Sequence, residues 1–558
     1  MNVKFTALAV FACALVYFGA LWQRPLLAPD EIRYAEIPRE MLFSGDFAVP
    51  RLNGLTYYEK PALGYWLIAA SMKIFGENRF AVRFPSALFT LLSALAVWLL
   101  AARGSDRRSG TVAAALFLTS GLVFAVGTTA VLDPPFAFFV TAGTAAGYFY
   151  CTEKDLGRKL LFLFCAGLFI GCGILIKGLL SPLLAGAAVT VFLLVKKEFR
   201  KLVLAVLPVL AGMIISALPG ALFMHRGAPD FWQEFILVEH FRRGLSGAGA
   251  GDDRSASFWL YLPVLIAGVL PAFLTVPAGI VAVWKRKRAF FLRDDLNLFC
   301  TVTVVAWFLF FSVVRAKLAT YILPLFPFLA VLGARALVEA EREGYLHIAD
   351  RILNVFCIIL GCGAVLFLVW HLVPAVPGKW KLYPALAAVP AFMALLLMLL
   401  WYNMAAREKA VNSDRKLLYF CIGTGVVMLS VNQLIPFKFL RDQDPESFIR
   451  RVVVPRLRPG TFILADGGMA AAAAWTLRHP VSVYVKPGEF KRGLERAGTG
   501  PATPQDLEKM LPRLLKGGHQ VVVLTRSKNR LREMPQKGMT IIRRGRLAAV
   551  FYGGGRDL

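Results

Sequence analysis

Cysteine spacings that mark zinc sites or disulfide frameworks are missing from this sequence. Its eight cysteines all fall inside apolar segments, and none belongs to a Cys-x-x-Cys pair or to a Cys/His cluster. Those spacings identify structural zinc modules and small disulfide-rich domains. The sequence therefore gives no indication of either class.

Acidic residues are also scarce. The chain has 35 Asp and Glu against 63 Lys and Arg, which gives a formal net charge of +28. A basic excess of this size indicates an anionic partner, such as nucleic acid, anionic lipid or a phosphorylated substrate. No nucleic-acid partner is expected, because the basic residues are dispersed around apolar segments and no recognition motif occurs.

Long apolar runs, in contrast, are abundant. The chain is 57% hydrophobic, which excludes an ordinary soluble enzyme. Runs of about 20 residues are long enough to cross the ~30 Å hydrocarbon core of a bilayer. We expect a polytopic α-helical membrane protein with about thirteen spans, near 4–22, 79–101, 110–127, 132–151, 160–176, 179–195, 201–222, 258–284, 297–314, 320–338, 352–373, 384–403 and 416–436.

The charged connections between these spans set the expected orientation. Five of them are short and basic, at 103–108, 196–201, 285–288, 339–351 and 407–416. Cytoplasmic loops collect Lys and Arg, so we place this set in the cytoplasm. The N-terminus then lies inside, and an odd number of spans puts the C-terminus outside. The first apolar run is followed by no small-residue cleavage site, which favours an uncleaved first span.

The expected outer side holds two long loops and a separate domain. The first loop, 23–78, contains two stretches typical of interfacial helices, at 31–43 and 61–75. The second loop, 223–257, is Gly-rich at 244–251. Residues 1–436 would therefore form the membrane domain, and 437–558 a C-terminal domain outside the membrane.

The composition of 437–558 is that of a soluble α/β domain. Strands are expected at 461–465, 481–485, 520–524 and 547–552, with helices at 467–478 and 504–516 between them. The domain is basic and has no nucleotide-binding loop. These features favour a domain that packs on the rest of the chain or on the membrane surface over a second active site.

Ionisable residues gather at the expected outer ends of the spans, in six clusters at 29–38, 57–62, 132–134, 176–179, 239–243 and 315–324. Charges close to a bilayer interior are costly and tend to be functional. Three of the clusters also have a simpler explanation: Asp30 and Asp133 stand where a residue caps a helix, and Lys60 stands where it would bind lipid headgroups. Six clusters on one membrane face favour a shared site.

Together the clusters supply what transfer of a sugar from a phosphate carrier needs. The anomeric carbon becomes cationic in the transition state, and the departing phosphate needs fixed positive charge. Lys and Arg supply that charge, while a carboxylate orients or deprotonates the acceptor. His240 and Glu59 are candidates to hold one divalent metal ion, zinc or similar, on the leaving phosphate; the alternative is that His240 binds no metal.

At these residues the sequence resembles the bacterial transferases that attach 4-amino-4-deoxy-L-arabinose (aminoarabinose) to lipid A. These belong to the protein-mannosyltransferase-like superfamily with the type-C glycosyltransferase fold. The resemblance is carried by ProAspGluIleArgTyrAlaGluIleProArgGluMet (29–41), TyrTyrGluLysProAla (57–62), LeuAspPro (132–134), LysGly (177–178), GluHisPhe (239–241), LysLeuAlaThrTyrIleLeuPro (317–324), AlaAlaTrpThrLeuArg (473–478) and ValPheTyr (550–552). Where members often have Thr and Ser, this chain has Ile32 and Pro38, which removes no charged group.

The resemblance implies an inverting pentosyltransferase that uses an undecaprenyl-phosphate-linked sugar donor and a lipid A phosphate acceptor. It would act at the outer face of a bacterial inner membrane, among membrane lipids, and confer resistance to polymyxin and other cationic peptides. The implied catalytic group is Asp30, Glu31, Arg33 and Asp133. The implied carrier-phosphate and substrate group is Tyr57, Tyr58, Lys60, Lys177, Lys317, Tyr321 and one or both of Arg242 and Arg243.

Two other functions remain open from the sequence. A related transferase with another sugar or a protein acceptor, such as a protein O-mannosyltransferase, would share the charged clusters. A transporter or flippase for polyprenyl lipids would instead show paired repeats or broken helices around a midplane site. No internal repeat is visible, and the charges lie at one face, so the transferase functions are favoured.

Overall fold

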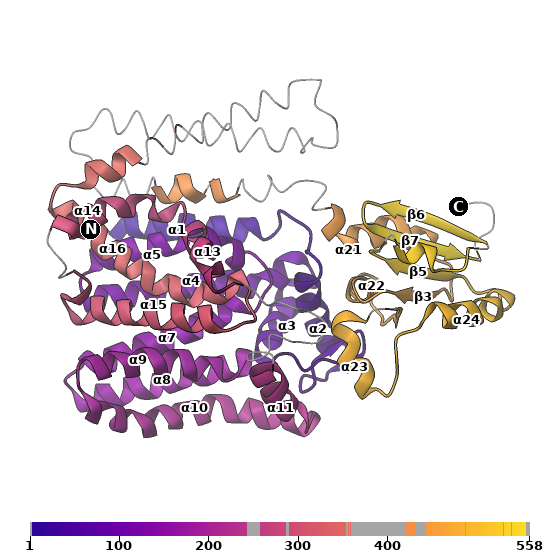
Figure 1. Ribbon diagram of the computed structural model, residues 1–558, viewed down its shortest axis with the longest axis horizontal. Coiled ribbons are helices and arrows are strands. Elements are labelled where there is room, and N and C mark those ends of the chain that lie inside the picture. The colour runs from indigo at the N-terminus through magenta and orange to yellow at the C-terminus, as the bar shows by residue number, and fades with distance from the viewer. Residues whose placement is uncertain are drawn as a thin grey trace.

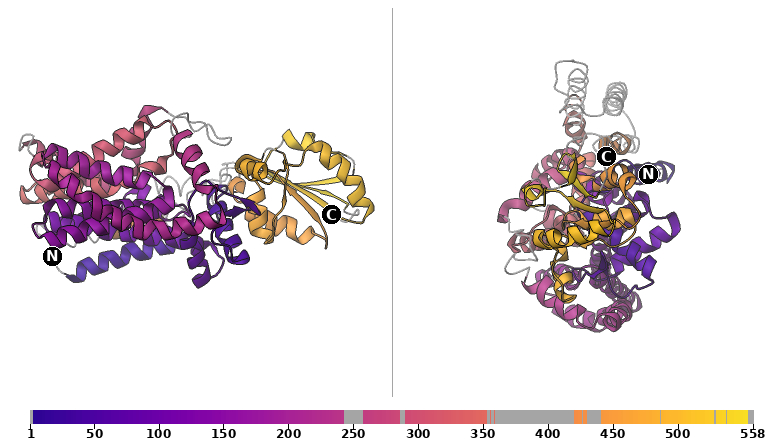
Figure 2. Two further views of the ribbon diagram at one scale, coloured as in Figure 1. Left: turned by 90° about the horizontal axis from the view of Figure 1, so that it is seen from below. Right: turned by 90° about the vertical axis from the view of Figure 1, so that its right-hand side faces the viewer.

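The computed structural model describes residues 3–242, 257–285, 290–352, 355, 358, 420–425, 427–429 and 441–553, without 486, 528 and 537. The expected spans at 352–373 and 384–403, most of the span at 416–436, and the Gly-rich stretch 244–251 lie outside these residues. Figure 1 shows a bundle of long helices with a smaller sheet domain beyond one end of it, and the left view in Figure 2 shows the same elongated arrangement. The fold class expected from the sequence is therefore confirmed.

Five helical segments of the described residues are long and apolar enough, by length and composition, to cross a membrane. They are α4 (Arg79–Gly104), α8 (Leu156–Lys177), α10 (Phe199–Gly227), α15 (Asp295–Val313) and Ala319–Arg342, which joins η5 (Ala319–Leu325) to α16 (Phe326–Arg342). The bundle also contains α1 (Val3–Ala20), α5 (Arg107–Leu118), α6 (Gly121–Gly127), α7 (Asp133–Thr152), α9 (Leu180–Val195), α13 (Tyr261–Gly268) and α14 (Val276–Lys285). Side chains of Asn78, Asp106, Asp155 and Asp294 cap α4, α5, α8 and α15, each accepting from the backbone amide three residues on.

Two of the expected spans are interrupted. The run at 110–127 divides into α5 and α6, and the run at 258–284 divides into η2 (Phe258–Leu260), α13, η3 (Ala272–Thr275) and α14. The two breaks meet, because the amide of Gly121 donates to the carbonyl of Leu270 at 2.7 Å. Backbone groups that lose their helical partners inside an apolar bundle need other hydrogen bonds. Here an amide at one break and a carbonyl at the other satisfy each other.

Helix α10 is held to the bundle by a close contact with α8. A Cβ atom built on Gly171 would lie 2.0 Å from the Ser216 hydroxyl, and one on Gly167 would lie 2.1 Å from the Val209 carbonyl. Small residues at such positions let two apolar helices approach closely. On its other sides α10 is exposed, and only Gly212 and Met224 are buried.

The first outer loop folds into α2 (Asp30–Ser44), the hairpin of β1 (Arg51–Leu52) and β2 (Leu55–Thr56), and α3 (Leu63–Phe75). The sequence placed both helices at the membrane interface, but every residue of α2 from Glu31 to Met41 is buried. The helix packs against α3 on one side and α22 (Ala470–Leu477) of the C-terminal domain on another. Two of its buried charges are paired within the helix, where Arg39 donates twice to Glu36 at 2.7 Å.

The C-terminal domain is a five-stranded mixed sheet in the order β4-β3-β5-β7-β6. Its strands are β3 (Phe462–Ala465), β4 (Ser482–Val483), β5 (Val521–Thr525), β6 (Met539–Arg544) and β7 (Leu547–Tyr552). The sequence located four of these and missed the edge strand β6. Helices α22, α23 (Lys491–Arg496) and α24 (Pro504–Lys516) complete the domain, and α21 (Pro445–Phe448), η7 (Ile449–Val453) and η8 (Val454–Arg456) precede its first strand.

The domain docks directly onto the first outer loop. The Asn53 side chain both donates to and accepts from the backbone of Val481, each at 2.7 Å. Arg478 pairs with Glu77 at 2.7 Å. Because these contacts run along the whole loop, the loop and the C-terminal domain form one face beyond the end of the bundle (Figures 1 and 2).

Candidate active site

The first expected cluster lies at the start of α2. Asp30 is the first helical residue, and the residue before it makes no side-chain cap to the helix. The Asp30 carboxylate instead accepts a hydrogen bond from Arg33 one turn along, so it does not serve as the cap considered from the sequence. Its side chain is 52% exposed, which leaves one face of the carboxylate open to a ligand.

Arg33 joins α2 to the C-terminal domain. Its Nη1 donates to Glu489, in η9 (Gly488–Phe490), at 2.6 Å. The guanidinium also lies 5.0 Å from the ring centre of Tyr34 and 5.9 Å from that of Tyr57, within the range of cation–π attraction. Burial raises the pKa of the Glu489 carboxyl, while Arg33 opposes that rise.

Glu489 was missed by the sequence analysis. It lies 456 residues from its partner Arg33, in a basic domain with no catalytic motif. No local pattern marks such a residue, because its meaning depends on a contact between distant parts of the chain. The only signal was that Glu489 is an acidic residue in an otherwise basic stretch, at 486–492.

Glu31, next to Asp30, has a different environment. It is fully buried and accepts from Arg24, from Arg83 at 2.7 and 2.9 Å, and from the backbone amides of Leu27 and Ala130 at 2.9 Å. Burial alone would raise its pKa, but the two arginines outweigh burial and hold the pKa of Glu31 at about 2. With both oxygens engaged, Glu31 ties α2 to α4 and to the turn before Asp133.

The second expected cluster, 57–62, lies beside Arg33 and the start of α2. The hydroxyls of Tyr57 and Tyr65 are buried and have no hydrogen-bond partner among the described residues. Buried hydroxyls are normally paired, so these two are available to a ligand. Lys60 is half-buried and donates to the carbonyl of Glu59 at 2.8 Å, and Glu59 lies within electrostatic range of Tyr57 and Glu489.

Asp133 and Lys177 form the third group. Lys177 ends α8 and its ammonium lies 2.9 Å from the carboxylate of Asp133, the first residue of α7. The same ammonium is 5.5 Å from the ring centre of Tyr321 in η5 and 5.2 Å from that of Phe136. Three of the residues expected at the site, from segments far apart in the sequence, are therefore brought together.

The groups around Asp30 and Asp133 are neighbours. Glu31 accepts from the Ala130 amide, three residues before Asp133. A Cβ atom on Gly64, at the start of α3, would lie 2.5 Å from the side chain of Leu132. Both Asp30 and Asp133 lie within electrostatic range of the Tyr34 hydroxyl. One charged site thus forms where α2, α3 and α7 begin.

Two of the expected residues serve other contacts. The Lys317 ammonium donates to the carbonyl of Val314, three residues before it. Tyr58 stacks edge-on against Phe231 at 5.3 Å and under Arg496 at 4.0 Å. Tyr58 therefore contacts the second outer loop and the C-terminal domain.

The remaining candidates lie outside the described side chains. They are His240, Arg242 and Arg243; η1 (Phe235–Arg242) gives the backbone path of the first two. Among the described residues, no group of three or more His, Cys, Asp or Glu side chains gathers as a metal site. The expectation of a metal on Glu59 and His240 stays a prediction.

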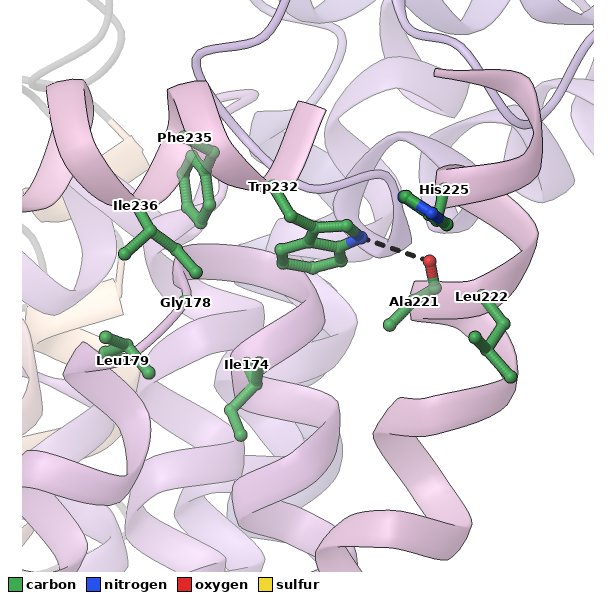
Figure 3. Close-up of a pocket in the computed structure, with 9 residues that line it drawn as sticks. All are labelled: Ile174, Gly178, Leu179, Ala221, Leu222, His225, Trp232, Phe235 and Ile236. Atoms are coloured by element: carbon green, nitrogen blue, oxygen red, sulfur yellow. Dashed lines mark hydrogen bonds between the residues drawn. The ribbon is translucent and has the colours of Figure 1, made fainter. Parts of the chain in front are cut away.

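An apolar pocket of about 290 Å³ lies beside the C-terminal end of α8. Figure 3 shows its walls, which come from α8, α10 and the segment of α11 (Phe231–Glu234) and η1. Gly178, the residue after Lys177, lines it together with Ile174, Leu179, Ala221, Leu222, His225, Trp232, Phe235 and Ile236. The Trp232 indole fixes one wall by donating to the carbonyl of Ala221 at 3.1 Å (Figure 3). Lys177 directly precedes Gly178, one of the lining residues, and an apolar pocket next to a cationic residue suits a ligand with an anionic head and a hydrocarbon tail.

Comparison with known proteins identifies relatives along nearly the whole chain. Residues 59–222 match the family model described as dolichyl-phosphate-mannose-protein mannosyltransferase. The undecaprenyl phosphate-alpha-4-amino-4-deoxy-L-arabinose arabinosyl transferase 2 of Proteus mirabilis is 34% identical over 558 residues, covering 96% of each chain. The transferase 1 of the same name from Sodalis glossinidius is 36% identical over 502 residues, covering 88% of this chain and 86% of that one.

Solved structures show the same fold. The crystal structure of ArnT from Cupriavidus metallidurans bound to undecaprenyl phosphate superposes with a TM-score of 0.80 at 23% identity, over 99% of this chain and 98% of that one. An oligosaccharyltransferase from Archaeoglobus fulgidus in the apo form gives a TM-score of 0.51 at 12% identity, over 94% and 69%. At these identities the likeness establishes the architecture alone.

Proposed function

Because this chain belongs to the family of undecaprenyl phosphate-α-4-amino-4-deoxy-L-arabinose arabinosyl transferases, we propose that it moves aminoarabinose from undecaprenyl phosphate to a phosphate of lipid A. The observation that carries the proposal is the Asp133–Lys177 ion pair in the same charged site as Asp30, with an apolar pocket lined by Gly178, the residue after Lys177. A cation near an apolar pocket suits a lipid phosphate, and a half-exposed carboxylate suits the positive charge that develops at the anomeric carbon.

In the proposed reaction an oxygen of the acceptor phosphate attacks the anomeric carbon of the donor sugar. The bond from that carbon to the carrier phosphate breaks, and its electron pair leaves on the phosphate oxygen. Attack on the face opposite the leaving group inverts the anomeric centre. Lys60, Lys177 and one or both of Arg242 and Arg243 would stabilise the charge that develops on the departing phosphate.

Asp30 would act on the other side of the reacting carbon. A phosphate acceptor is already nucleophilic near neutral pH, so it needs no strong general base. The carboxylate would orient the acceptor and balance the positive charge at the anomeric carbon. Arg33 holds it in place for this role. A side chain fixed in this way loses little freedom on reaching the transition state.

The donor sugar carries an amino group, which is cationic at neutral pH. Glu489 supplies a carboxylate close to Asp30, since both pair with Arg33, and the unpaired hydroxyls of Tyr57 and Tyr65 lie in the same cluster. These groups would bind the ammonium and the ring hydroxyls of the sugar. Sites built to hydrogen-bond one substrate group discriminate strongly against analogues that lack it.

The carrier's hydrocarbon tail would lie along the apolar pocket beyond Gly178 (Figure 3). Burying hydrocarbon contributes roughly 25 cal/mol per Å² of apolar surface, so the tail would supply much of the carrier's affinity. The phosphate would then lie near Lys177, which ends α8 and directly precedes the pocket residue Gly178.

A divalent metal on Glu59 and His240 is a further part of the proposal. Two protein ligands leave most of the coordination sphere to phosphate oxygens and water, which fits an ion that arrives with the carrier. Its chemistry would be to offset charge on the leaving phosphate. Removing divalent ions with a chelator should then lower transfer, and adding back zinc should restore it; equal activity with and without chelator would remove the metal from the proposal.

We also infer the location of the enzyme. The basic connections favour a bacterial inner membrane with the N-terminus in the cytoplasm and the C-terminal domain in the periplasm. Transfer of a cationic sugar at that face would reduce the negative charge of lipid A. Binding of polymyxin and other cationic peptides would weaken as a result.

The experiment that tests this function is lipid A mass spectrometry. The host would lack its own transferase and make the aminoarabinose carrier, and would express wild type or Asp30→Ala. We expect the mass of one or more aminoarabinose groups with wild type alone. No added mass, with the protein present in the membrane, would shift the assignment to another sugar or a protein acceptor, which the match to the mannosyltransferase model also accommodates.

A further inference from the structure

One side chain of the C-terminal domain contacts both outer loops: that of Arg496, the last residue of α23. Its Nε and Nη2 donate to the two carboxylate oxygens of Glu234, the Nε bond at 2.9 Å. Its Nη1 donates to the backbone carbonyl of Thr56 at 2.9 Å. Its guanidinium also stacks over the ring of Tyr58 at 4.0 Å.

These contacts exceed those of an ordinary surface ion pair. Isolated surface pairs contribute little to stability. Here the pair is bidentate, the side chains of Arg496 and Glu234 are only 24% and 23% exposed, and Arg492 is a second cation 3.9 Å from Glu234. The planar fork of arginine suits simultaneous binding of a carboxylate, a carbonyl and an aromatic face.

On the side of the second loop, Glu234 ends α11. The residues around it line the apolar pocket: Trp232 two positions before, and Phe235 and Ile236 directly after (Figure 3). The opposite side of the pocket is formed by Ile174, Gly178 and Leu179, next to Lys177. A shift of Glu234 would therefore move one wall of the pocket relative to Lys177.

On the side of the first loop, Thr56 ends β2 and Tyr58 follows it. The next two residues are Glu59 and Lys60, and the Tyr57 hydroxyl lies in the Asp30 cluster. Arg496 thus contacts a short segment that leads directly into the charged site. The same guanidinium holds this segment and the pocket wall.

We propose that Arg496 is a positioning residue for the transfer reaction, which fixes the pocket wall of α11 and η1 relative to the Thr56–Lys60 segment. The inference rests on the proposed function, in which the pocket takes the carrier tail and Lys60 its phosphate. Arg496 itself contacts neither. Its loss would separate the two parts of the carrier site while leaving Asp30, Asp133 and Lys177 in place.

The test measures transfer kinetics of the purified full-length protein with undecaprenyl-phosphate-linked aminoarabinose and lipid A. A small displacement of binding groups costs about tenfold or more in reactions that depend on alignment. We therefore expect Arg496→Ala to raise KM for the donor roughly tenfold and to change kcat by less than about twofold. Arg513→Ala removes an exposed arginine of α24 in the same domain and should leave both constants unchanged.

A double-mutant cycle separates positioning from general destabilisation. Glu234→Ala should raise KM as Arg496→Ala does, and the double variant should be no worse than Arg496→Ala, because both changes break one contact. Arg496→Lys, which keeps the charge and loses the fork, should recover part of the affinity. If Arg496→Ala does not accumulate as folded protein, Glu234→Gln replaces it with the same expectation.

Three results would overturn the inference: an unchanged KM in Arg496→Ala, a loss in the double variant equal to the product of the single losses, or a fall in kcat at constant KM. A separate readout is the binding of undecaprenyl phosphate alone. It is measured as the rise in unfolding temperature that this ligand gives in wild type and in Arg496→Ala. A wild-type protein that binds the carrier and transfers nothing would instead count against the proposed function, and leave the positioning of the carrier site measurable.

Discussion

Helices α2 and α10 have opposite relations to their surroundings. Helix α2 buries its charged residues, including Glu31, Arg33, Glu36 and Arg39. Helix α10 exposes its apolar residues, with Val203 at 76% and Leu207 at 77%. The difference follows from their neighbours: α10 has the length and hydropathy of a membrane-spanning helix, so lipid would be its solvent, whereas protein partners surround α2. The exposed fraction of a side chain therefore does not by itself show whether a helix faces lipid or protein. The partners of its side chains must also be known.

The largest loss of stability is expected from a change at Glu31 of α2. Replacing Glu31 with Gln keeps the shape but leaves Arg24 and Arg83 as uncompensated buried charges, and removing one member of a buried pair costs about 3–5 kcal/mol. We expect a large fall in the thermal unfolding temperature of the purified protein, with loss of transfer following from unfolding. Glu153→Gln, at the exposed Arg103 pair, is the control and should unfold close to wild type. Similar unfolding temperatures for the two variants would contradict the role of Glu31 as the anchor of α2.

A change at Asp30, the residue before Glu31, should affect transfer strongly and stability little. Asp30→Asn removes a charge that is half exposed and makes one ion pair, so we expect an unfolding temperature close to wild type. Removing a group that stabilises or orients the reacting atoms lowers kcat by about 100-fold or more. Transfer kinetics and thermal unfolding on the same preparation check both halves. Near-normal turnover in Asp30→Asn would remove Asp30 from the mechanism.

For α10, the contact most sensitive to substitution is the close approach of Gly167 and Gly171 of α8, which we call the glycine seam. Gly171→Leu would place a side chain against Ser216 and the backbone of Met213, and overpacking of this kind costs about 1–3 kcal/mol. We expect α10 to separate from α8, seen as a lower unfolding temperature and faster proteolysis near 196–201. Gly186→Leu, on α9 with no atom within 4 Å of the added Cβ, is the matched control. Equal behaviour of the two variants would show that the seam does not hold α10.

A smaller effect is expected from pH. Burial raises the pKa of Glu36 to about 8, although hydrogen bonds from Arg39 oppose it. A carboxyl whose pKa is raised on folding stabilises the folded state below its unfolded pKa, and that contribution is lost as the pH rises through the folded value. The unfolding temperature should therefore decline as the pH rises from about 5 to about 8. Glu36→Gln should flatten this decline; an unchanged slope would assign it to other groups.

Much of the fold follows from local sequence pattern. Helix α24 and strand β7 begin and end where the sequence placed them, and α2 differs by one residue at each end from the expected 31–43. The breaks at Gly121 and Pro271 were not foreseen, because apolar composition is continuous across both. Proline alone does not mark them, since Pro208 and Pro219 lie inside α10 without ending it.

The site was only partly predictable for a similar reason. Asp30, Asp133 and Lys177 stand out because charges are rare at the ends of apolar helices. Glu489 and Arg496 lie in a domain where charge is common, and each acts through a partner more than 250 residues away. Sequence pattern reports local surroundings, so contacts of this range become visible only in the folded chain.

The docking of the sheet domain onto the first outer loop limits how this domain can be exchanged between related enzymes. Asn53, Arg33 and Thr56 on one side meet Val481, Glu489 and Arg496 on the other. The domain is therefore not a removable module, and its residues must change together with those of the loop. A hybrid that joins this membrane bundle to a relative's domain should regain activity only when the loop is exchanged with it.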